Sequence, residues 1–440
     1  MTSSDKSSLP PFSTTMAGFI LPLTSGLISA VSSVLILRVI SNSRQKLSTT
    51  YHRLMATMSL FDFIASIFMA LGTIMIPEDS YFHFDGPTLG TDFTCRLQGF
   101  ILTFGLTGGA AMYLSLSWYF VCSITLKMDP VKIKRRVEPL LLFYSLFLAA
   151  FFPIWIVSKD LIHPNPNLSY CHLTIIPKNC NNSNWYDCDW LDSEQLDDFH
   201  TTTRMIITWN FVHVALITVA MLIIVWTIVD KNKKIKAKII SLELKSNLDN
   251  VSDIDDGGMF ELRQSRIVVC QAFMYIAACW LTWFFYFISI VCDRPFYAAD
   301  VLNAIFFPLQ GFWNFFIFIY DKAYLVRHTD EECKTFWKAV KKILLRPDDT
   351  PTMMFVNVSA LQSQTEQDEE NKSAPSDNEP NLSAENKSAP SDNEPNLSAA
   401  VANFSLESVD LFEVSLPSEF RERLNDVVSN PLMSVENQSP

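Results

Sequence analysis

The sequence predicts an all-α membrane protein, in which a seven-transmembrane helix bundle is followed by a cytosolic amphipathic helix and a disordered tail. Two observations predict this class. Hydrophobic residues make up 49% of the 440 residues although 18% are charged, and the two kinds lie in separate blocks. The hydrophobic blocks also have the length of about 20 residues that a spanning helix needs. Seven blocks qualify: 16–40, 54–76, 97–126, 137–158, 203–229, 267–291 and 301–320.

The first 15 residues have neither the basic start nor the cleavage pattern of a signal peptide. We therefore expect residues 1–15 to be a short extracellular segment and the first hydrophobic block to remain as a membrane anchor. The seven-transmembrane domain is expected over 16–320, the amphipathic helix over 321–346 and the tail over 347–440.

Lys and Arg gather in alternate connections between the predicted spans, which by the positive-inside rule places these connections in the cytosol. The basic residues are Arg44, Lys46, Arg53, Lys127, Lys132, Lys134, Arg135, Arg136, Lys322, Arg327, Lys334, Lys338, Lys341, Lys342 and Arg346. The intervening connections are acidic, with Glu78, Asp79, Asp85, Asp92, Asp187, Asp189, Asp192, Glu194, Asp197 and Asp198. A multi-pass protein of the plasma membrane follows, with its N-terminus outside and its C-terminus in the cytosol.

The tail carries most of the net charge. Residues 347–440 contain 18 acidic and 4 basic residues, a net charge of −14, whereas the whole chain has −12. Few hydrophobic residues and many Ser, Asn, Glu and Pro predict disorder. Two identical copies of ENKSAPSDNEPNLSA occupy 370–384 and 385–399. Phosphorylation of their serines by a kinase would suit an arrestin-like partner, but slippage in a tolerant linker also explains the repeat and is preferred.

Four cysteines fall on the predicted outer side, where disulfides form. They are Cys95, Cys171, Cys180 and Cys188, and they allow three pairings that spacing alone does not resolve. The same outer loop contains the glycosylation sequons of Asn167 and Asn181. Sequons also occur in the tail, for example at Asn371, where the topology forbids their use.

Several motifs occur together in the order of a known family. They are Tyr51-His-Arg-Leu-Met, Ser59-Leu-Phe-Asp, Cys95-Arg-Leu-Gln-Gly-Phe, Tyr170-Cys-His-Leu and Pro308-Leu-Gln-Gly-Phe-Trp-Asn. Over residues 16–325 the chain resembles the seven-helix orphan receptors of diatoms and other protists. It is more distantly similar to slime-mould cyclic-AMP receptors and to secretin- and rhodopsin-type receptors.

The resemblance implies a G-protein-coupled receptor for an unknown extracellular ligand, with a heterotrimeric G protein as partner. It also implies the disulfides Cys95–Cys171 and Cys180–Cys188. The chain departs from rhodopsin-type receptors because the third span lacks the acidic-Arg-aromatic triplet and the seventh lacks Asn-Pro-x-x-Tyr. Their switch mechanism is therefore not carried over.

Asp62 lies inside the second span, where a carboxylate needs partners from within the bundle. Asn314, Ser115 and Ser117 are the expected partners. A polar switch network around Asp62, which would bind sodium or a proton, and a purely structural anchor explain Asp62 equally well. Pro308 removes a backbone hydrogen bond and Gly311 permits close approach, so a kink is expected in the seventh span.

The expected ligand pocket lies in the extracellular half of the bundle. Trp209 and His213 share one helical face, and Trp280 and Trp283 share another. His213 is the strongest candidate because a polar ring at this depth needs a partner. Packing in the core or at the lipid interface is the favoured explanation for each aromatic residue taken alone.

Two cytosolic surfaces are expected. Thr329 and Glu332 have the spacing of a capping box before an amphipathic helix suited to the anionic inner leaflet of the lipid bilayer. The G protein is expected to contact a basic loop and a cytosolic extension of the fifth span. The residues are Lys132, Lys134, Arg135, Arg136, Lys233 and Lys234. Charge that only sets the topology is the alternative.

Other membrane classes fit less well. A retinal protein needs a lysine inside the seventh span, and 301–320 has none. A membrane-embedded zinc enzyme needs several buried His and acidic residues, and only His213 and Asp62 lie clearly inside the spans. No catalytic residue, metal or cofactor is therefore expected. A nucleic-acid partner is not expected either. A seven-helix transporter or channel is the alternative, disfavoured because the sequence shows no internal symmetry or broken helices.

Overall fold

The computed structural model describes residues 14–80, 83–165, 168–174, 193–246, 256–291, 297–329 and 335–349. The chain divides into two units, Met1–Glu369 and Glu370–Pro440. All described residues belong to the first unit. Of the tail predicted to be disordered over 347–440, the structure describes only Pro347–Asp349, which form a 3-10 turn. Both repeat copies lie outside the described residues.

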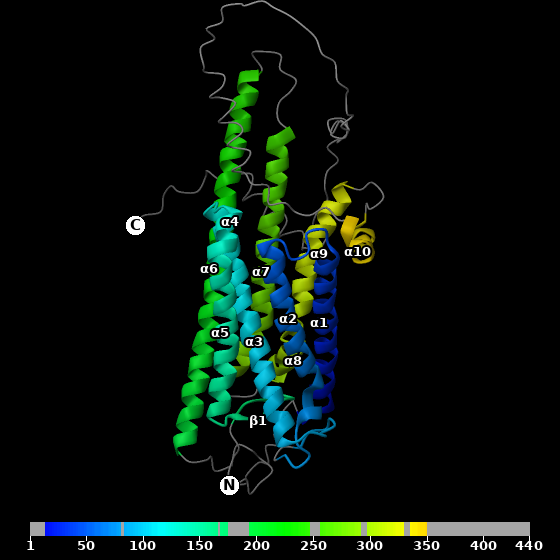
Figure 1. Cartoon of the computed structure of the whole chain (residues 1–440), viewed down its shortest axis with the longest axis vertical. Helices are drawn as coiled ribbons and strands as arrows, with labels where there is room; N and C mark the ends of the chain where they lie inside the picture. Colours follow the sequence, from blue (N-terminus) through cyan, green and yellow to red (C-terminus); the bar gives the residue numbers. More distant parts are fainter. Residues whose placement is uncertain are drawn as a thin grey trace, which may run out of the picture. The chain divides into compact units, whose positions relative to one another are not determined.

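The described part is built from upright helices and one short hairpin (Figure 1). Its first half contains α1 (Met16–Asn42), α2 (Thr50–Leu71) with the 3-10 turn η2 (Gly72–Met75), α3 (Asp92–Phe120) with the π turn η3 (Val121–Thr125), α4 (Pro130–Lys132), η4 (Ile133–Val137) and α5 (Glu138–Ser158). Its second half contains β1 (Ile162–Pro164), β2 (Cys171–Leu173), α6 (Ser193–Ser246), α7 (Asp256–Val291), α8 (Tyr297–Phe306), α9 (Gln310–Thr329), α10 (Phe336–Leu345) and η7 (Pro347–Asp349).

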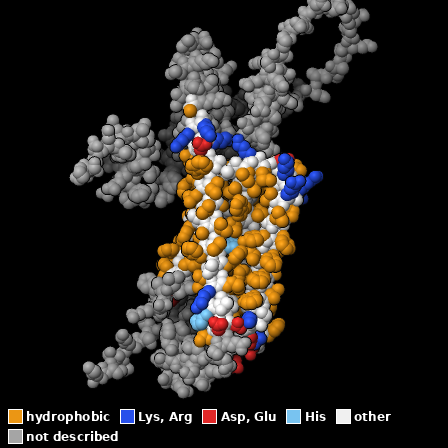
Figure 2. All heavy atoms as spheres, turned by 90° about the vertical axis from the view of Figure 1, so that its left-hand side faces the viewer, with side chains coloured by type: hydrophobic (Ala, Val, Ile, Leu, Met, Phe, Trp, Pro, Cys, Tyr) orange, Lys and Arg blue, Asp and Glu red, His pale blue; other side chains and the backbone are white. Residues whose placement is uncertain are grey.

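Six helical segments of the described chain are long and apolar enough to cross a membrane. A seventh span results if the bent pair α8 and α9 is counted as one, and these two helices meet at 52°. Figure 2 shows a hydrophobic middle band, with Lys and Arg gathered at one end and Asp and Glu mostly at the other. The chain is therefore a multi-pass helical membrane protein. We call these two ends the basic end and the acidic end.

The third span lies at the centre of the bundle, because 78% of its apolar window is buried, against 33% for Pro130–Ser158. Close packing against α2 depends on glycine. A Cβ on Gly105 would lie 2.9 Å from the backbone nitrogen of Ala65, and one on Gly108 would lie 2.4 Å from the ring of Phe61. The two helices could not approach this closely with larger side chains.

The structure corrects several predicted boundaries. Lys132–Arg136, expected as a loop, is helical through α4 and η4. The α7 helix begins at Asp256, 11 residues before the expected start of the sixth span at residue 267. Thr329 is the last residue of α9 and not the cap of α10, whose N-cap position is occupied by Thr335. Hydrophobicity marks the membrane part of a helix, but the backbone continues wherever polar residues also favour a helix.

Candidate functional site

A buried polar group joins three helices near the middle of the bundle. Asp62 on α2 is 3% exposed, and the Asn314 side-chain amide on α9 donates a hydrogen bond of 2.6 Å to its Oδ2 atom. The Tyr113 hydroxyl on α3 donates to Asn314 Oδ1. Gln310, one turn before Asn314, also hydrogen-bonds Asp62. We call Asp62, Tyr113, Gln310 and Asn314 the Asp62 network.

A small cavity adjoins this network. Its lining includes Asp62, Ser66, Gly105, Phe307, Pro308 and Gln310. The cavity has room for about one water molecule. It lies where α8 ends and α9 begins, so the carboxylate of Asp62 and an interruption of the helical backbone face the same small space.

The interruption between α8 and α9 is held by serines of α1. Pro308 has no backbone N–H to donate to the Ala304 carbonyl, which accepts from Ser25 Oγ at 3.2 Å instead. At the break, the Gly311 N–H donates to Ser29 Oγ at 2.9 Å. Ser66 of α2 donates to the same Ser29 oxygen at 2.8 Å. A Cβ on Gly311 would lie 2.3 Å from Ser33 Oγ, so α1 packs directly against this turn. The expected kink at Pro308 and Gly311 is thus a full break between two helices.

The serines expected beside Asp62 have other partners. Ser117 donates to the Tyr113 carbonyl on its own helix, and Ser115 bonds Ser145 of α5. Tyr113 and Gln310 were missed by the sequence analysis. Both lie four residues before a predicted network residue, Ser117 and Asn314 respectively, so helical spacing within the spans could have identified them.

The four residues expected to line a ligand pocket occupy three environments, because only His213 and Trp209 contact each other. His213 is buried, and a hydrogen bond of 2.8 Å joins its Nε2 atom to the Tyr144 hydroxyl of α5. Trp209 packs on the same imidazole, with ring centroids 3.9 Å apart. Trp283 packs edge-on against Phe307 at the end of α8. Trp280 is 39% exposed and donates to Thr218 of α6.

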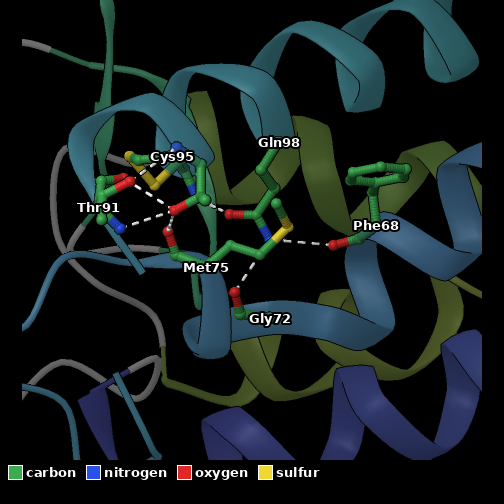
Figure 3. The surroundings of a disulfide bond; sticks show 8 residues. Phe68, Gly72, Met75, Thr91, Cys95 and Gln98 are labelled. Carbon is green, nitrogen blue, oxygen red and sulfur yellow. Dashed lines mark hydrogen bonds between the residues drawn. A yellow bond between two sulfur atoms is a disulfide. The ribbon is translucent and has the colours of Figure 1, made fainter. Parts of the chain in front are cut away.

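At the acidic end, a disulfide joins Cys95 of α3 to Cys171 of β2, as the family resemblance implied. Figure 3 shows Gln98 beside this bond. Its amide nitrogen donates to the carbonyls of Phe68 and Gly72, at 3.0 and 2.9 Å. Its amide oxygen accepts from the Cys171 N–H at 3.0 Å. One buried side chain therefore connects α2, α3 and the hairpin.

The hairpin pairs His163 with His172 across β1 and β2. Burial lowers the pKa of His172 from its usual 6.5 to about 4. The pKa of His163 is lowered as well, chiefly by burial, while Asp160 and Asp92 oppose this and Arg96 adds to it. An ion pair of 2.9 Å between Arg96 and Asp160 attaches the base of the hairpin to α3. The hairpin is therefore a site where both histidines are favoured in the neutral form.

The remaining predicted outer residues, Cys180, Cys188, Asn167 and Asn181, lie outside the described residues. Their disulfide and glycosylation stay predictions.

At the basic end, Arg53 of α2 forms an ion pair with Glu138 of α5. Thr50 donates to the same carboxylate at 2.7 Å. A buried carboxylate with two such partners holds the ends of α2 and α5 together. On α9, Asp321 is buried beside Lys322, whose ammonium lies 5.0 Å from the Phe318 ring.

The α10 helix has two distinct faces. Ala339, Val340 and Ile343 are buried against the rest of the bundle. Trp337 and Leu345 are 76% and 68% exposed, and Lys338 and Lys341 are exposed as well. Exposed large apolar residues beside lysines suit an interfacial helix.

No protein-family model matches this chain, and no curated protein matches it. Membership of the receptor family stays a prediction from the motifs.

Proposed function

We propose that this protein is a G-protein-coupled receptor for an unknown extracellular ligand. The observation that carries the proposal is the Asp62 network, which joins α2, α3 and α9 beside the α8–α9 break. A receptor needs a two-state element that both of its ends can bias. A hydrogen-bonded joint between three helices, placed next to an interrupted backbone, has the properties of such an element.

In this proposal the acidic end faces outward. The hairpin is fixed to α3 by Cys95–Cys171 and Gln98, so a ligand that displaces the hairpin also acts on α3. The Tyr113–Asn314 bond transmits that motion to α9. Asp62 then exchanges partners or gains a proton or sodium ion, and the one-water cavity supplies the space for that change.

The basic end would receive the heterotrimeric G protein. Lys233 and Lys234 of α6 are exposed. Figure 1 shows α6 continuing past the end of α5 on this side of the bundle. Lys134 is exposed and lies four residues before the buried Glu138, so the spacing puts it on the same side of the helix as that residue. We assign α10 to the inner leaflet, because its exposed apolar side chains lie beside lysines.

A transporter or channel is the second candidate, and one observation favours it. Secondary transporters place discontinuous helices and a buried carboxylate together near the middle of the membrane. The α8–α9 break and Asp62 have this arrangement. The break answers one of the two arguments against this class, the absence of a broken helix. The other argument, that the sequence has no internal symmetry, still disfavours a transporter.

One preparation tests both candidates. The full chain is reconstituted in vesicles with heterotrimeric G proteins, and binding of a non-hydrolysable GTP analogue is measured without added ligand. Proton flux and sodium flux under imposed gradients are measured in the same vesicles. The variants are Asp62→Asn and, as the matched control, Asp79→Asn, whose side chain is exposed at the acidic end.

The receptor proposal expects nucleotide exchange above that of empty vesicles and no ion flux. Asp62→Asn should change basal exchange by about fivefold or more, because the network biases the two states, whereas Asp79→Asn should not change it. Ion flux that Asp62→Asn abolishes, without exchange on any G protein, would overturn the receptor proposal in favour of transport.

A further inference from the structure

Three cations at the basic end lie on the lipid-facing side of the fourth span. Lys132, Arg135 and Arg136 are exposed, and in the described chain none of them forms an ion pair. The helix continues from η4 directly into α5, so residues four apart fall on one side of it. Arg136 therefore lies above Leu140, which is 69% exposed. Lys132 lies one turn further toward the basic end.

Below these cations, α5 presents a column of exposed aromatic rings. Phe143, Phe147 and Phe151 are 69%, 53% and 39% exposed. Their rings stack at 6.1 and 5.8 Å between centroids, and Trp155 continues the column at 6.3 Å. Among the described helices, α5 packs against α3, where Ser145 hydrogen-bonds Ser115, and against α6, where Phe152 and Trp155 make contacts. Phe143, Phe147 and Phe151 remain exposed on its other side.

The dimensions match one lipid leaflet. Leu140 and Phe151 are 11 residues apart, which corresponds to about 16 Å along a helix. Half of a bilayer core of about 30 Å is nearly the same length. A phospholipid of the leaflet at the basic end would therefore place its headgroup at the cations and its acyl chains along the rings. Figure 2 shows Lys and Arg at the rim of a hydrophobic face.

The charge favours a polyanionic headgroup. Two adjacent arginines offer planar forks that bind phosphate oxygens in pairs, and Lys132 adds a third positive charge. A headgroup with one net negative charge would leave two of the cations without a partner. Basic pockets at the cytosolic rim of membrane proteins bind phosphorylated inositol headgroups by this chemistry.

We propose that Lys132, Arg135 and Arg136, together with the Phe143–Phe147–Phe151 column, form a binding site for a phosphorylated inositol phospholipid. The site goes beyond the receptor proposal and does not depend on it. It also reassigns three of the cations expected to face a G protein, because their helix turns them toward lipid and leaves Lys134, Lys233 and Lys234 for a protein partner.

The test is native mass spectrometry of the purified full chain, titrated with phosphatidylinositol 4,5-bisphosphate or with phosphatidylserine. The triple variant Lys132→Gln/Arg135→Gln/Arg136→Gln is compared with Arg38→Gln/Arg44→Gln/Lys46→Gln, which removes three exposed cations elsewhere at the basic end. Inositol 1,4,5-trisphosphate serves as the headgroup without acyl chains. Thermal unfolding shows whether each variant is folded, and Arg136→Gln against Arg44→Gln replaces the triple variants if either fails to fold.

Each cation removed from the site should weaken binding about fivefold. We therefore expect the triple site variant to lose about a hundredfold in affinity for the inositol lipid, and the control variant, whose cations lie away from the site, to lose less than about threefold. Phosphatidylserine and the soluble headgroup should both bind more weakly than the inositol lipid. Equal losses in the two triple variants would show diffuse attraction and overturn the site. Binding of the free headgroup as tightly as the lipid would also overturn the site. So would a site variant that loses nucleotide exchange but binds the lipid normally, because that result would indicate a surface for docking a protein.

Discussion

Gln98 connects more of the structure than any of the residues that the sequence marked as functional at the acidic end. Its side chain makes three hydrogen bonds to backbone groups of α2 and β2. Gln98→Met keeps the approximate volume but removes all three. We expect the free energy of unfolding to fall by about 2–4 kcal/mol, because buried backbone groups lose their partners. Thermal or denaturant unfolding of the purified chain measures the change.

Leu97→Met is the matched control, since Leu97 is a neighbour that is 37% exposed. It should change stability by no more than about 0.5 kcal/mol. Non-reducing peptide mapping checks that Cys95–Cys171 still forms in both variants. Equal stability of the two variants would contradict the role given to Gln98.

His172 predicts a pH dependence of the hairpin. Its folded-state pKa of about 4 lies below the usual 6.5, so the unfolded hairpin binds a proton more readily than the folded one. The stabilisation is complete above pH 6.5 and is lost as the pH falls toward 4. We expect Tm to be roughly 3–6 °C lower at about pH 5 than at about pH 7.5, and differential scanning fluorimetry measures this.

The groups around His172 define the control. Tyr170 lies edge-on to its ring, and the opposite strand presents His163, which Asp160, Asp92 and Arg96 surround. His172→Phe should remove most of the pH-dependent loss, and His163→Phe a smaller part. If the double variant His163→Phe/His172→Phe shows the same decrease in Tm at low pH as the wild-type chain, the two histidines do not cause that decrease.

Part of the Asp62 network could be predicted from the sequence. Asp62 and Asn314 were predicted to meet because an intramembrane carboxylate requires a partner, and they do form a hydrogen bond. The choice of Ser117 was wrong, because a serine inside a helix can bond the carbonyl four residues earlier on its own helix. Tyr113 and Ser117 lie four apart on one face of α3, so depth along the helix and length of the side chain decide between them, and hydrophobicity encodes neither.

At the scale of elements, the α8–α9 break depends on Pro308 and Ser29 together. Ser29→Ala leaves the Gly311 N–H without its acceptor, and should lower the free energy of unfolding by about 2 kcal/mol. Pro308→Ala supplies the missing N–H and lets the helix close, so that Gly311 can bond Phe307. In that background Ser29→Ala should cost about half as much. A double-mutant cycle measured by denaturant unfolding gives both values.

Ser32→Ala is the control for this cycle, because Ser32 donates to the Ile28 carbonyl on its own helix and not to the α8–α9 turn. Its effect should be the same in the wild-type chain and in the Pro308→Ala variant. Additive effects of Ser29→Ala and Pro308→Ala would mean that the serine does not stabilise the break.

Element lengths were the least predictable part of the fold. Hydrophobicity set the start of the sixth span at residue 267, whereas α7 begins at Asp256. It also set the end of the fifth at Val229, and the cytosolic extension expected beyond that point is confirmed, because α6 continues to Ser246. The ion pair of Lys234 with Asp230 supports this extension. The sequence predicted a bend at Pro308, and its conversion into a break required contacts from α1 that lie far away in the chain.

At the scale of the whole molecule, the separation of charge was visible in the sequence and is visible on the surface (Figure 2). The positive-inside rule needs only counts of Lys and Arg in short connections, so the sequence carries it without knowledge of packing. Packing between spans required three dimensions, because the glycines that admit α2 against α3 are identified by what surrounds them.

The positive-inside rule predicts that the acidic end of the bundle faces the outside of the cell, and antibody staining of epitope tags can check this. One tag is placed before Met1 and another after Pro440, in separate full-length versions of the chain. We expect antibodies to stain the first tag on intact cells and the second tag only after permeabilisation. Staining of the second tag on intact cells should stay below about a tenth of its value in permeabilised cells. The reason is that about fifteen basic residues hold the opposite end of the bundle in the cytosol. Reversed staining would invert the topology. It would also place Cys95 and Cys171 in a reducing compartment, where a disulfide between them would not persist.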